Sequence, residues 1–289
     1  MQRRDFLTSL GAASLLAPLA TMAKLPPVPA KKIGLQLYTL RDNIGKDLIK
    51  TLEAVAKIGY KEVELAGYAD GKFYGKSPSE FKKILSDLGL SVPSGHYTTG
   101  IINKTKGTLT NDWSRAMADA AELGQKYAVC AYLFPEERTK IDDYKNHCDL
   151  FSKSAEVAKQ NGLQFCYHNH DFEFMPLDGQ MPYDLILANT DKNLVKMELD
   201  LYWITKAGQD PVAYFKKHQG RFPLWHVKDM DKTDQSFAEV GTGTINFAKI
   251  FANKKTAGLA HYFVEQDVCK RPALEAVELS FKNLKGLKT

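Results

Sequence analysis

The sequence has few cysteines, and no two of them lie close together. Cys130, Cys148, Cys166 and Cys269 are widely separated among the 289 residues, so there is no Cys-x-x-Cys motif. This spacing disfavours a disulfide framework and a cysteine-based zinc site. Free thiols, mostly buried, are the expectation, although an oxidising compartment would still permit one bridge.

A dinucleotide-binding turn and a dense basic segment are also missing. After the first apolar run, residues 35–42 are Leu-Gln-Leu-Tyr-Thr-Leu-Arg-Asp instead of Gly-x-Gly-x-x-Gly, which disfavours an open dinucleotide-binding sheet. The formal net charge is +5, and the basic residues are spread along the chain. We therefore expect no binding to nucleic acid.

The N-terminal apolar stretch, residues 10–20, is too short to span the roughly 20 residues of a bilayer, and it contains Pro18. It follows Arg-Arg-Asp-Phe-Leu at residues 3–7 and precedes Thr-Met-Ala at 21–23, which is typical of a twin-arginine export signal. We predict a signal peptide over residues 1–23 and a Pro-rich linker over 24–32. The mature protein is then expected in the periplasm, exported by the twin-arginine machinery, without stable membrane insertion.

The remaining chain alternates short apolar runs with amphipathic stretches. The predicted strands are 33–38, 62–65, 91–95, 127–133, 163–168, 194–200, 223–227 and 261–265. The predicted helices are 48–58, 79–88, 111–123, 144–160, 182–188, 211–218, 246–252 and 271–284. Strand–helix units repeated over about 255 residues predict a single α/β domain, a (β/α)8 TIM barrel, over residues 33–289.

The active site of such a barrel is built from polar residues at the carboxyl ends of its strands. Asp200, His226 and Glu265 follow three different strands, and this set of ligands favours a divalent metal. His168 and His170 share one side of a strand because side chains alternate. The other strand-end candidates are Gln36, Tyr38, Glu64, His96, Glu173, Glu198, Lys228 and Asp267.

Seven motifs carry a resemblance to a known family. They are Gly34-Leu-Gln-Leu-Tyr38, Gly59-Tyr-Lys-Glu-Val-Glu-Leu65, Ser94-Gly-His96, Tyr167-His-Asn-His-Asp-Phe-Glu-Phe174, Leu199-Asp-Leu-Tyr-Trp203, His226-Val-Lys-Asp229 and Gly241-Thr-Gly243. Together they resemble the sugar phosphate isomerase/epimerase family, the xylose isomerase-like TIM barrels, over essentially the whole mature chain. The resemblance fixes the fold better than the substrate.

The resemblance implies one divalent ion, first of all manganese, with magnesium, cobalt or zinc as alternatives. Family members bind it with a glutamate from strand five, an aspartate, a histidine and a glutamate. The last three correspond to Asp200, His226 and Glu265. At the strand-five position this chain has His168 instead of glutamate, so we predict His168 as the fourth ligand unless Glu173 reaches the metal. A ligated histidine cannot abstract a proton, which puts two-base epimerisation in doubt.

The first functional prediction is a metal-dependent sugar isomerase or epimerase that abstracts a proton next to a carbonyl and forms an enediolate. Glu265, Glu173 and His170 are the candidate bases, and Lys228 would neutralise the oxyanion. Contacts to the sugar are expected from Gln36, Tyr38, Glu64, His96 and Trp203, with Trp113, Tyr132 and Tyr202 as further aromatic candidates.

Three alternatives stay open. The same groups would support cleavage of a 3-keto-glycoside by β-elimination or hydrolysis. A non-catalytic sugar-binding barrel is the second alternative, and a nuclease like endonuclease IV is disfavoured by export and by the mild charge. Two further features have structural interpretations: Glu198 as a buried partner of Lys196 or Lys228, and residues 241–243 as a tight turn or substrate loop.

Overall fold

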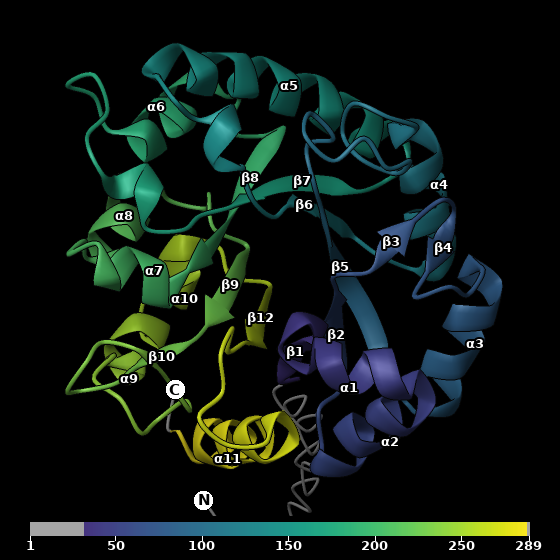
Figure 1. Cartoon of the computed structure of the whole chain (residues 1–289). Helices are drawn as coiled ribbons and strands as arrows, with labels where there is room; N and C mark the ends of the chain where they lie inside the picture. Colours follow the sequence, from purple (N-terminus) through teal and green to yellow (C-terminus); the bar gives the residue numbers. More distant parts are fainter. Residues whose placement is uncertain (1–31, 288–289) are drawn as a thin grey trace, which may run out of the picture. The chain divides into compact units, whose positions relative to one another are not determined.

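The computed structural model describes residues 32–287. The predicted signal peptide, residues 1–23, and the predicted linker up to residue 31 lie outside the described residues. Figure 1 shows the described chain as a ring of strands with helices around it. No helix within residues 32–287 combines the length and the apolar character needed to cross a membrane.

Parallel strands close into one barrel. In chain order they are β1 (Gly34–Gln36), β2 (Glu62–Leu65), β5 (Ser91–Tyr97), β6 (Tyr127–Cys130), β7 (Gln164–His168), β8 (Val195–Asp200), β9 (Leu224–Val227) and β12 (His261–Val264). Each strand pairs with the next in this order, and β12 pairs with β1 through Phe263 and Gly34, which closes the ring. The predicted (β/α)8 TIM barrel is confirmed.

Helices and short turns connect the strands. The helices are α1 (Arg41–Lys46), α2 (Leu48–Ile58), α3 (Pro78–Asp87), α4 (Trp113–Leu123), α5 (Ile141–Gln160), α6 (Pro182–Asn189), α7 (Leu201–Lys206), α8 (Pro211–Lys217), α9 (Phe247–Phe251), α10 (Lys254–Ala257) and α11 (Ala273–Gly286). The 3-10 turns are η1 (Leu37–Leu40), η2 (Pro135–Glu137) and η3 (Phe172–Phe174). Two small hairpins pair β3 (Tyr68–Ala69) with β4 (Lys72–Phe73), and β10 (Asp229–Met230) with β11 (Phe237–Ala238).

Local sequence signals set several helix ends. Helix α3 begins with a capping box, in which Ser77 and Glu80 accept each other's backbone N–H, and Pro78 fills the first helical position. The side chain of Asp47 caps α2, and Gly59 ends this helix with a φ of 120°, a conformation that favours glycine. These ends direct the chain back into the next strand.

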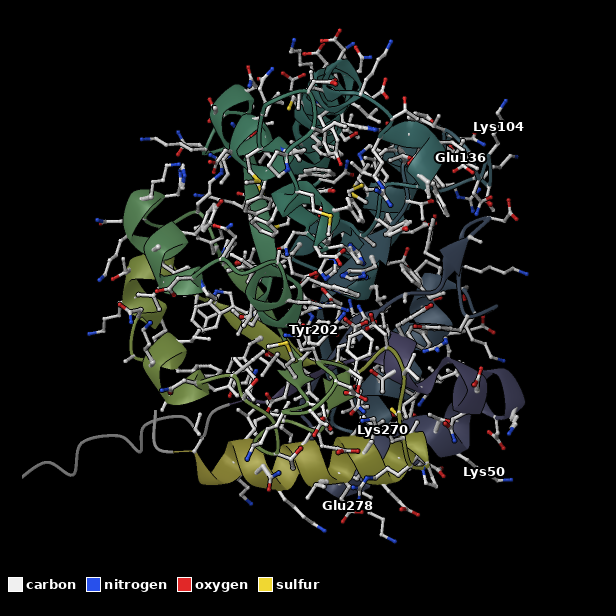
Figure 2. All side chains as sticks on the ribbon, turned by 60° about the vertical axis from the view of Figure 1, so that its left-hand side comes forward. Lys50, Lys104, Glu136, Tyr202, Lys270 and Glu278 are labelled. Carbon is white, nitrogen blue, oxygen red and sulfur yellow. The ribbon has the colours of Figure 1, made fainter. Side chains whose placement is uncertain are left out.

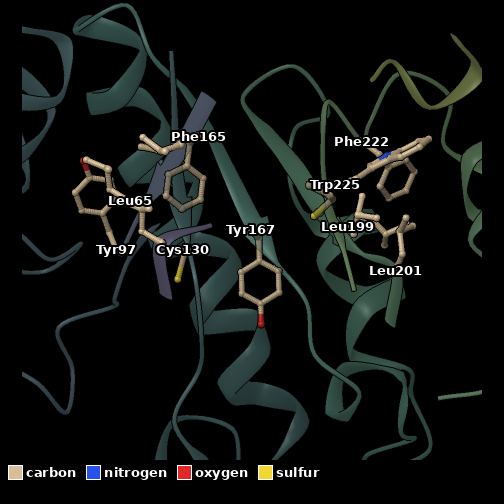
Figure 3. Close-up of a cluster of buried hydrophobic side chains, with 14 of the residues drawn as sticks. Leu65, Tyr97, Cys130, Phe165, Tyr167, Leu199, Leu201, Phe222 and Trp225 are labelled. Atoms are coloured by element: carbon tan, nitrogen blue, oxygen red, sulfur yellow. The ribbon is translucent and has the colours of Figure 1, made fainter. Parts of the chain in front are cut away.

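Alternate residues of each strand point outward to the helices. Among the buried side chains in Figure 3, Tyr167 packs against Phe151 of α5 with ring centroids 4.9 Å apart, and Trp225 stacks on Phe215 of α8 at 4.9 Å. Charged side chains such as Lys104 and Glu136 are exposed at the periphery (Figure 2). The outer core therefore joins the strands to the helices.

The barrel interior has its own small apolar core. It consists of Val129, Cys166, Leu224 and Phe263, all fully buried. Because side chains alternate along a strand, the polar residues two positions further on, such as His168, His226 and Glu265, lie on the same inner face nearer the carboxyl ends. The apolar layer thus forms the floor beneath a polar one.

The predicted strands and helices all overlap observed ones, with differences at the ends. Strand β6 stops at Cys130 instead of residue 133, because the chain turns into η2 at Pro135. Strand β5 continues to Tyr97, which places His96 inside it. Helices α1, α7 and α10 were not predicted; each has six residues or fewer. All four cysteines are free, as predicted, and three are buried.

Candidate metal centre

Four predicted ligands meet at the carboxyl end of the barrel. One nitrogen or oxygen atom from each of His168, Asp200, His226 and Glu265 lies within 4.8 Å of the others, and all four residues are buried. They come from the ends of β7, β8, β9 and β12. We refer to these four residues as the outer group. The structure brings together the residues that the sequence predicted as metal ligands.

Asp200 is fixed by the backbone around it. Its Oδ1 caps α7 by accepting the N–H groups of Tyr202 and Trp203, each at 2.9 Å, and its own N–H donates to Oδ1 of Asn169 at 3.0 Å. The other oxygen, Oδ2, faces Nε2 of His168 at 3.3 Å. One carboxylate oxygen is therefore held by the protein while the other points into the site.

Lys228 supplies the positive charge beside this group. Its Nζ lies 3.0 Å from Asp200, 2.7 Å from Glu265 and 2.7 Å from Asp267. Burial alone would lower the pKa of Lys228, but these carboxylates outweigh burial and hold it well above its usual range. Burial raises the pKa of Asp267 to about 6 even though Lys228 opposes the rise.

His226 faces two sets of side chains with its two ring nitrogens. Nδ1 lies 2.6 Å from Oε2 of Glu265, in the outer group. Nε2 lies 2.6 Å from Oε2 of Glu64 and 3.2 Å from Oε2 of Glu198. Together with His96, these residues form a second cluster of potential ligand atoms within 4.8 Å, which we call the inner group: Glu64, His96, Glu198 and His226.

The outer group fits a divalent cation. Nδ1 of His226 lies 2.6 Å from Oε2 of Glu265, but it has no hydrogen-bond partner of acceptable geometry among residues 32–287. Buried polar atoms without partners are costly, and a bound cation is one way to satisfy them. Two imidazoles and two carboxylates also suit several divalent metals. His168, Asp200, His226 and Glu265 would hold the ion.

A pocket of about 450 Å³ opens above the outer group. Its polar lining includes His168, Glu265, Lys228 and Asp267. Aromatic side chains complete it: Tyr38, Tyr97, Tyr132, Phe134 and the imidazoles of His96 and His170. The volume is in the range of small-molecule sites.

Among the predicted sugar contacts, Tyr38 and His96 line this pocket. Gln36 and Glu64 are fully buried below it, where Nε2 of Gln36 donates to Glu64 at 2.8 Å. Trp203 is not part of the lining; it packs against His170 with ring centroids 5.4 Å apart. Gln36 and Glu64 therefore lie beneath the pocket lining, whereas Trp203 is partly exposed beside it.

Glu173 does not reach the outer group. The loop after β7 folds into η3, and both carboxylate oxygens of Glu173 are occupied, one by the hydroxyl of Tyr167 and the other by the N–H of His170 at 2.8 Å. Burial raises the pKa of Glu173 to about 7. Glu173 thus orients the loop that carries His170, and His168 is the residue of β7 that lies in the outer group.

Two other sequence interpretations need correction. Glu198 does not pair with Lys196 or Lys228: its Oε2 lies 2.6 Å from Nε2 of His96, while Lys196 donates to the carbonyl of Gly220. Trp113 does not offer its face to a sugar, because it is buried on α4 with its N–H bonded to the carbonyl of Ser154.

The Gly241-Thr-Gly243 segment is a turn organised by Asp229. One carboxylate oxygen of Asp229 accepts the N–H groups of Gly241 and Gly243, each at 2.9 Å, and the other accepts those of Met230 and Ile245. A Cβ at residue 243 would lie 2.3 Å from Asp229, so glycine is required there. These amides are occupied within the protein, and the tight-turn interpretation is confirmed.

The protein is thus a TIM barrel with a cluster of histidine and carboxylate side chains at the carboxyl ends of its strands, where barrels of this kind carry their active sites. This chain belongs to the xylose isomerase-like TIM barrel family, whose model matches residues 52–282. The predicted signal peptide, residues 1–23, lies outside the matched residues.

Individual relatives agree with this assignment. A solved sugar phosphate isomerase/epimerase from Parabacteroides distasonis ATCC 8503 is 32% identical, with a TM-score of 0.78, over 92% of this chain and 97% of that one. Inosose dehydratase from Geobacillus kaustophilus is 22% identical over 74% of this chain and 77% of its own length. The solved 3-keto-D-glucoside 4-epimerase from E. coli has a TM-score of 0.68 at 16% identity, over 89% and 99% of the two chains, and shows the shared fold.

Proposed function

We propose that this protein is a divalent-metal-dependent lyase of keto sugars. In this proposal it removes a proton next to a ketone and expels the substituent on the following carbon. A 3-keto-glycoside fits this chemistry, because the hydrogen on C2 is acidified by the C3 ketone and the glycosidic oxygen is on C1. The name of one relative, inosose dehydratase, supports elimination, and that of a protein with the same fold, 3-keto-D-glucoside 4-epimerase, supports a keto sugar as substrate.

One observation favours elimination over an epimerisation that uses two bases. Both carboxylates that line the pocket, Glu265 and Asp267, lie at the end of the same strand, β12. Inversion at a carbon by two bases needs one base on each face of the ring. Elimination needs a base on one face only, which this arrangement supplies.

Glu265 is the proposed base. Burial would raise its pKa, but Lys228 and His226 hold it well below its usual range, so the carboxylate is ionised. It would take the C2 proton, the C1–C2 double bond would form, and the C1–O bond would break. A divalent ion bound to the outer group would polarise the ketone oxygen.

Two other side chains are placed to complete the step. Lys228, whose ammonium is buried beside Glu265, would stabilise the negative charge that develops on oxygen. Asp267, with its pKa raised to about 6 by burial, is a suitable proton donor to the departing glycosidic oxygen. The products are the free aglycone alcohol and an unsaturated keto sugar, to which water can then add.

Isomerase or epimerase activity is the second candidate. His96 and His170 also line the pocket, and either could return the proton to the other face of the carbon. The similarity to a protein named sugar phosphate isomerase/epimerase also favours it.

The test is an assay of the manganese-loaded protein with 4-nitrophenyl 3-keto-glucoside, followed by absorbance and NMR. Elimination predicts release of 4-nitrophenol together with an unsaturated keto sugar or its hydrate. Glu265→Gln should lose this activity, whereas Glu62→Gln, a matched change at the other end of the barrel, should keep it. An intact glycoside with inverted stereochemistry would support epimerisation, and saturable binding without any product would support a non-catalytic barrel.

We also propose that the protein is exported, supported by the twin-arginine pattern at residues 3–7. Replacing Arg3 and Arg4 with lysine should retain the unprocessed chain in the cytoplasm. Normal export of that variant, measured by cell fractionation, would contradict the proposal.

A further inference from the structure

The inner group lies beneath the pocket, and of its members only His226 has a role in the proposed lyase reaction. Glu64, Glu198 and His226 are fully buried, and the side chain of His96 is only 10% exposed, at the pocket floor. Oε2 of Glu198 lies 2.6 Å from Nε2 of His96, and Oε2 of Glu64 lies 3.3 Å from the same nitrogen. Two carboxylates and two imidazoles thus converge beneath the pocket, and of these only His96 is partly exposed.

Hydrogen bonds within the protein leave this cluster incomplete. If each histidine carries one proton on Nε2, these two protons satisfy Oε2 of Glu64 and Oε2 of Glu198. The other oxygen of each carboxylate, Oε1, is buried and has no partner within residues 32–287. Unpartnered buried carboxylate oxygens are rare because removing them from water is costly.

The charges of the inner group also favour a bound cation. Glu64 and Glu198 place two fully buried carboxylates in the same cluster. Lys228, the cation beside the outer group, forms ion pairs with Asp200, Glu265 and Asp267. It forms none with Glu64 or Glu198. One divalent cation would neutralise the two inner carboxylates.

We infer that Glu64, His96, Glu198 and His226 form a second divalent-cation site, and that His226 bridges it to the outer site through its two ring nitrogens. Nδ1 faces the outer group and Nε2 faces the inner one. A ring bound on both sides carries no N–H proton, so filling both sites releases that proton to solvent. A His2Glu2 donor set suits zinc, which accepts nitrogen and carboxylate ligands in tetrahedral sites.

The alternative is that Glu64 and Glu198 only orient His226, by accepting the proton from Nε2, as carboxylates behind metal-bound histidines often do. The two possibilities differ in stoichiometry. The bridged arrangement predicts two ions per chain, and the orienting role predicts one.

The experiment uses zinc as the probe. The metal-free protein is dialysed against a low excess of zinc and its content is measured by mass spectrometry, while anomalous diffraction at the zinc edge locates the ions. We expect two equivalents and two anomalous peaks, on either side of His226. Glu198→Gln should hold one equivalent, as should the outer variant Asp200→Asn.

Glu62→Gln is the matched control. Glu62 is on β2, two residues before Glu64, and pairs with His261 at 2.7 Å at the amino end of the barrel, so this variant should keep two equivalents. A single zinc peak in the outer group of the wild-type protein would overturn the inference, even if the variants failed to fold. That result would leave the proposed lyase activity unaffected, since the lyase reaction uses the outer group, Lys228 and Asp267 and no ion in the inner group.

Discussion

Burial of a single carboxyl group, that of Glu173, gives a measurable pH dependence of stability. Its pKa rises from 4.5 to about 7 on folding, so the folded protein holds a proton that the unfolded chain releases between these values. The stabilising contribution of this protonation is complete below about pH 4.5 and is lost as the pH rises through 7. At about 1.4 kcal/mol per pKa unit, the change is up to about 3 kcal/mol.

Glu173→Gln removes this titration. Relative to wild type, the variant should therefore gain up to about 3 kcal/mol of unfolding free energy between pH 5 and pH 8. Urea unfolding of both proteins at the two pH values measures the difference, with the exposed Glu53→Gln on α2 as the control. Equal pH dependence of wild type and Glu173→Gln would show that the group titrates normally.

Single residues also show what the sequence could and could not predict. Asp200, His226 and Glu265 were predictable because each follows an apolar strand, and parallel strands end at one face of the barrel. Glu173 was misplaced as a candidate base because the path of the loop after β7 depends on Tyr167 and on the backbone of His170. A sequence motif does not contain that path.

The loop that Asp229 organises is an element whose order depends on one side chain. Four backbone N–H groups, from Met230 and the 241–245 segment, donate to this buried carboxylate. Asp229→Ala leaves these donors without partners, and each buried unsatisfied donor costs about 1–3 kcal/mol where water cannot replace the acceptor. We expect a net loss of roughly 2–4 kcal/mol, because water reaches part of the loop.

Hydrogen–deuterium exchange followed by mass spectrometry tests this expectation. Amides of residues 239–245 should exchange at least tenfold faster in Asp229→Ala, while those of α5 stay protected. Unchanged exchange in the loop would mean that other contacts order it.

At the level of whole elements, the strands and long helices were predictable from periodicity, and their ends and the short helices were not. Helix α7, for example, is capped by Asp200, which is also the last residue of β8. The inner group likewise depends on the closed barrel: Glu64 of β2 and His226 of β9 are 162 residues apart in sequence and lie on strands that are not neighbours, so they meet across the barrel interior. The repeated strand–helix pattern predicted the barrel, but it did not predict which inward side chains meet across the interior.

For the whole molecule, metal binding should add to the stability of the barrel. A ligand that binds only the folded state stabilises it by about 2.7 kcal/mol at a hundredfold excess over Kd. For a domain of this size, that corresponds to a rise in Tm of roughly 5–11 °C. Wild-type protein should thus melt at a lower temperature with chelator than with manganese.

Asp200→Asn provides the comparison, because it removes one outer ligand while keeping the hydrogen-bonding shape that caps α7. Its Tm should respond much less to manganese or chelator than that of wild type in differential scanning calorimetry. Equal manganese shifts in both proteins would place the ion elsewhere.

The central claim is that Glu265, beside a metal held by the outer group, removes a proton next to a sugar ketone. Exchange of that hydrogen with deuterium oxide measures it most directly, using a 3-keto sugar that lacks a leaving group, so that nothing but proton transfer is observed by NMR. The account predicts exchange with metal-loaded wild type and none above background after chelation. Exchange with Glu265→Gln should be at least 1000-fold slower, roughly the loss expected when a catalytic base is removed. Equal exchange rates for wild type and Glu265→Gln would contradict it.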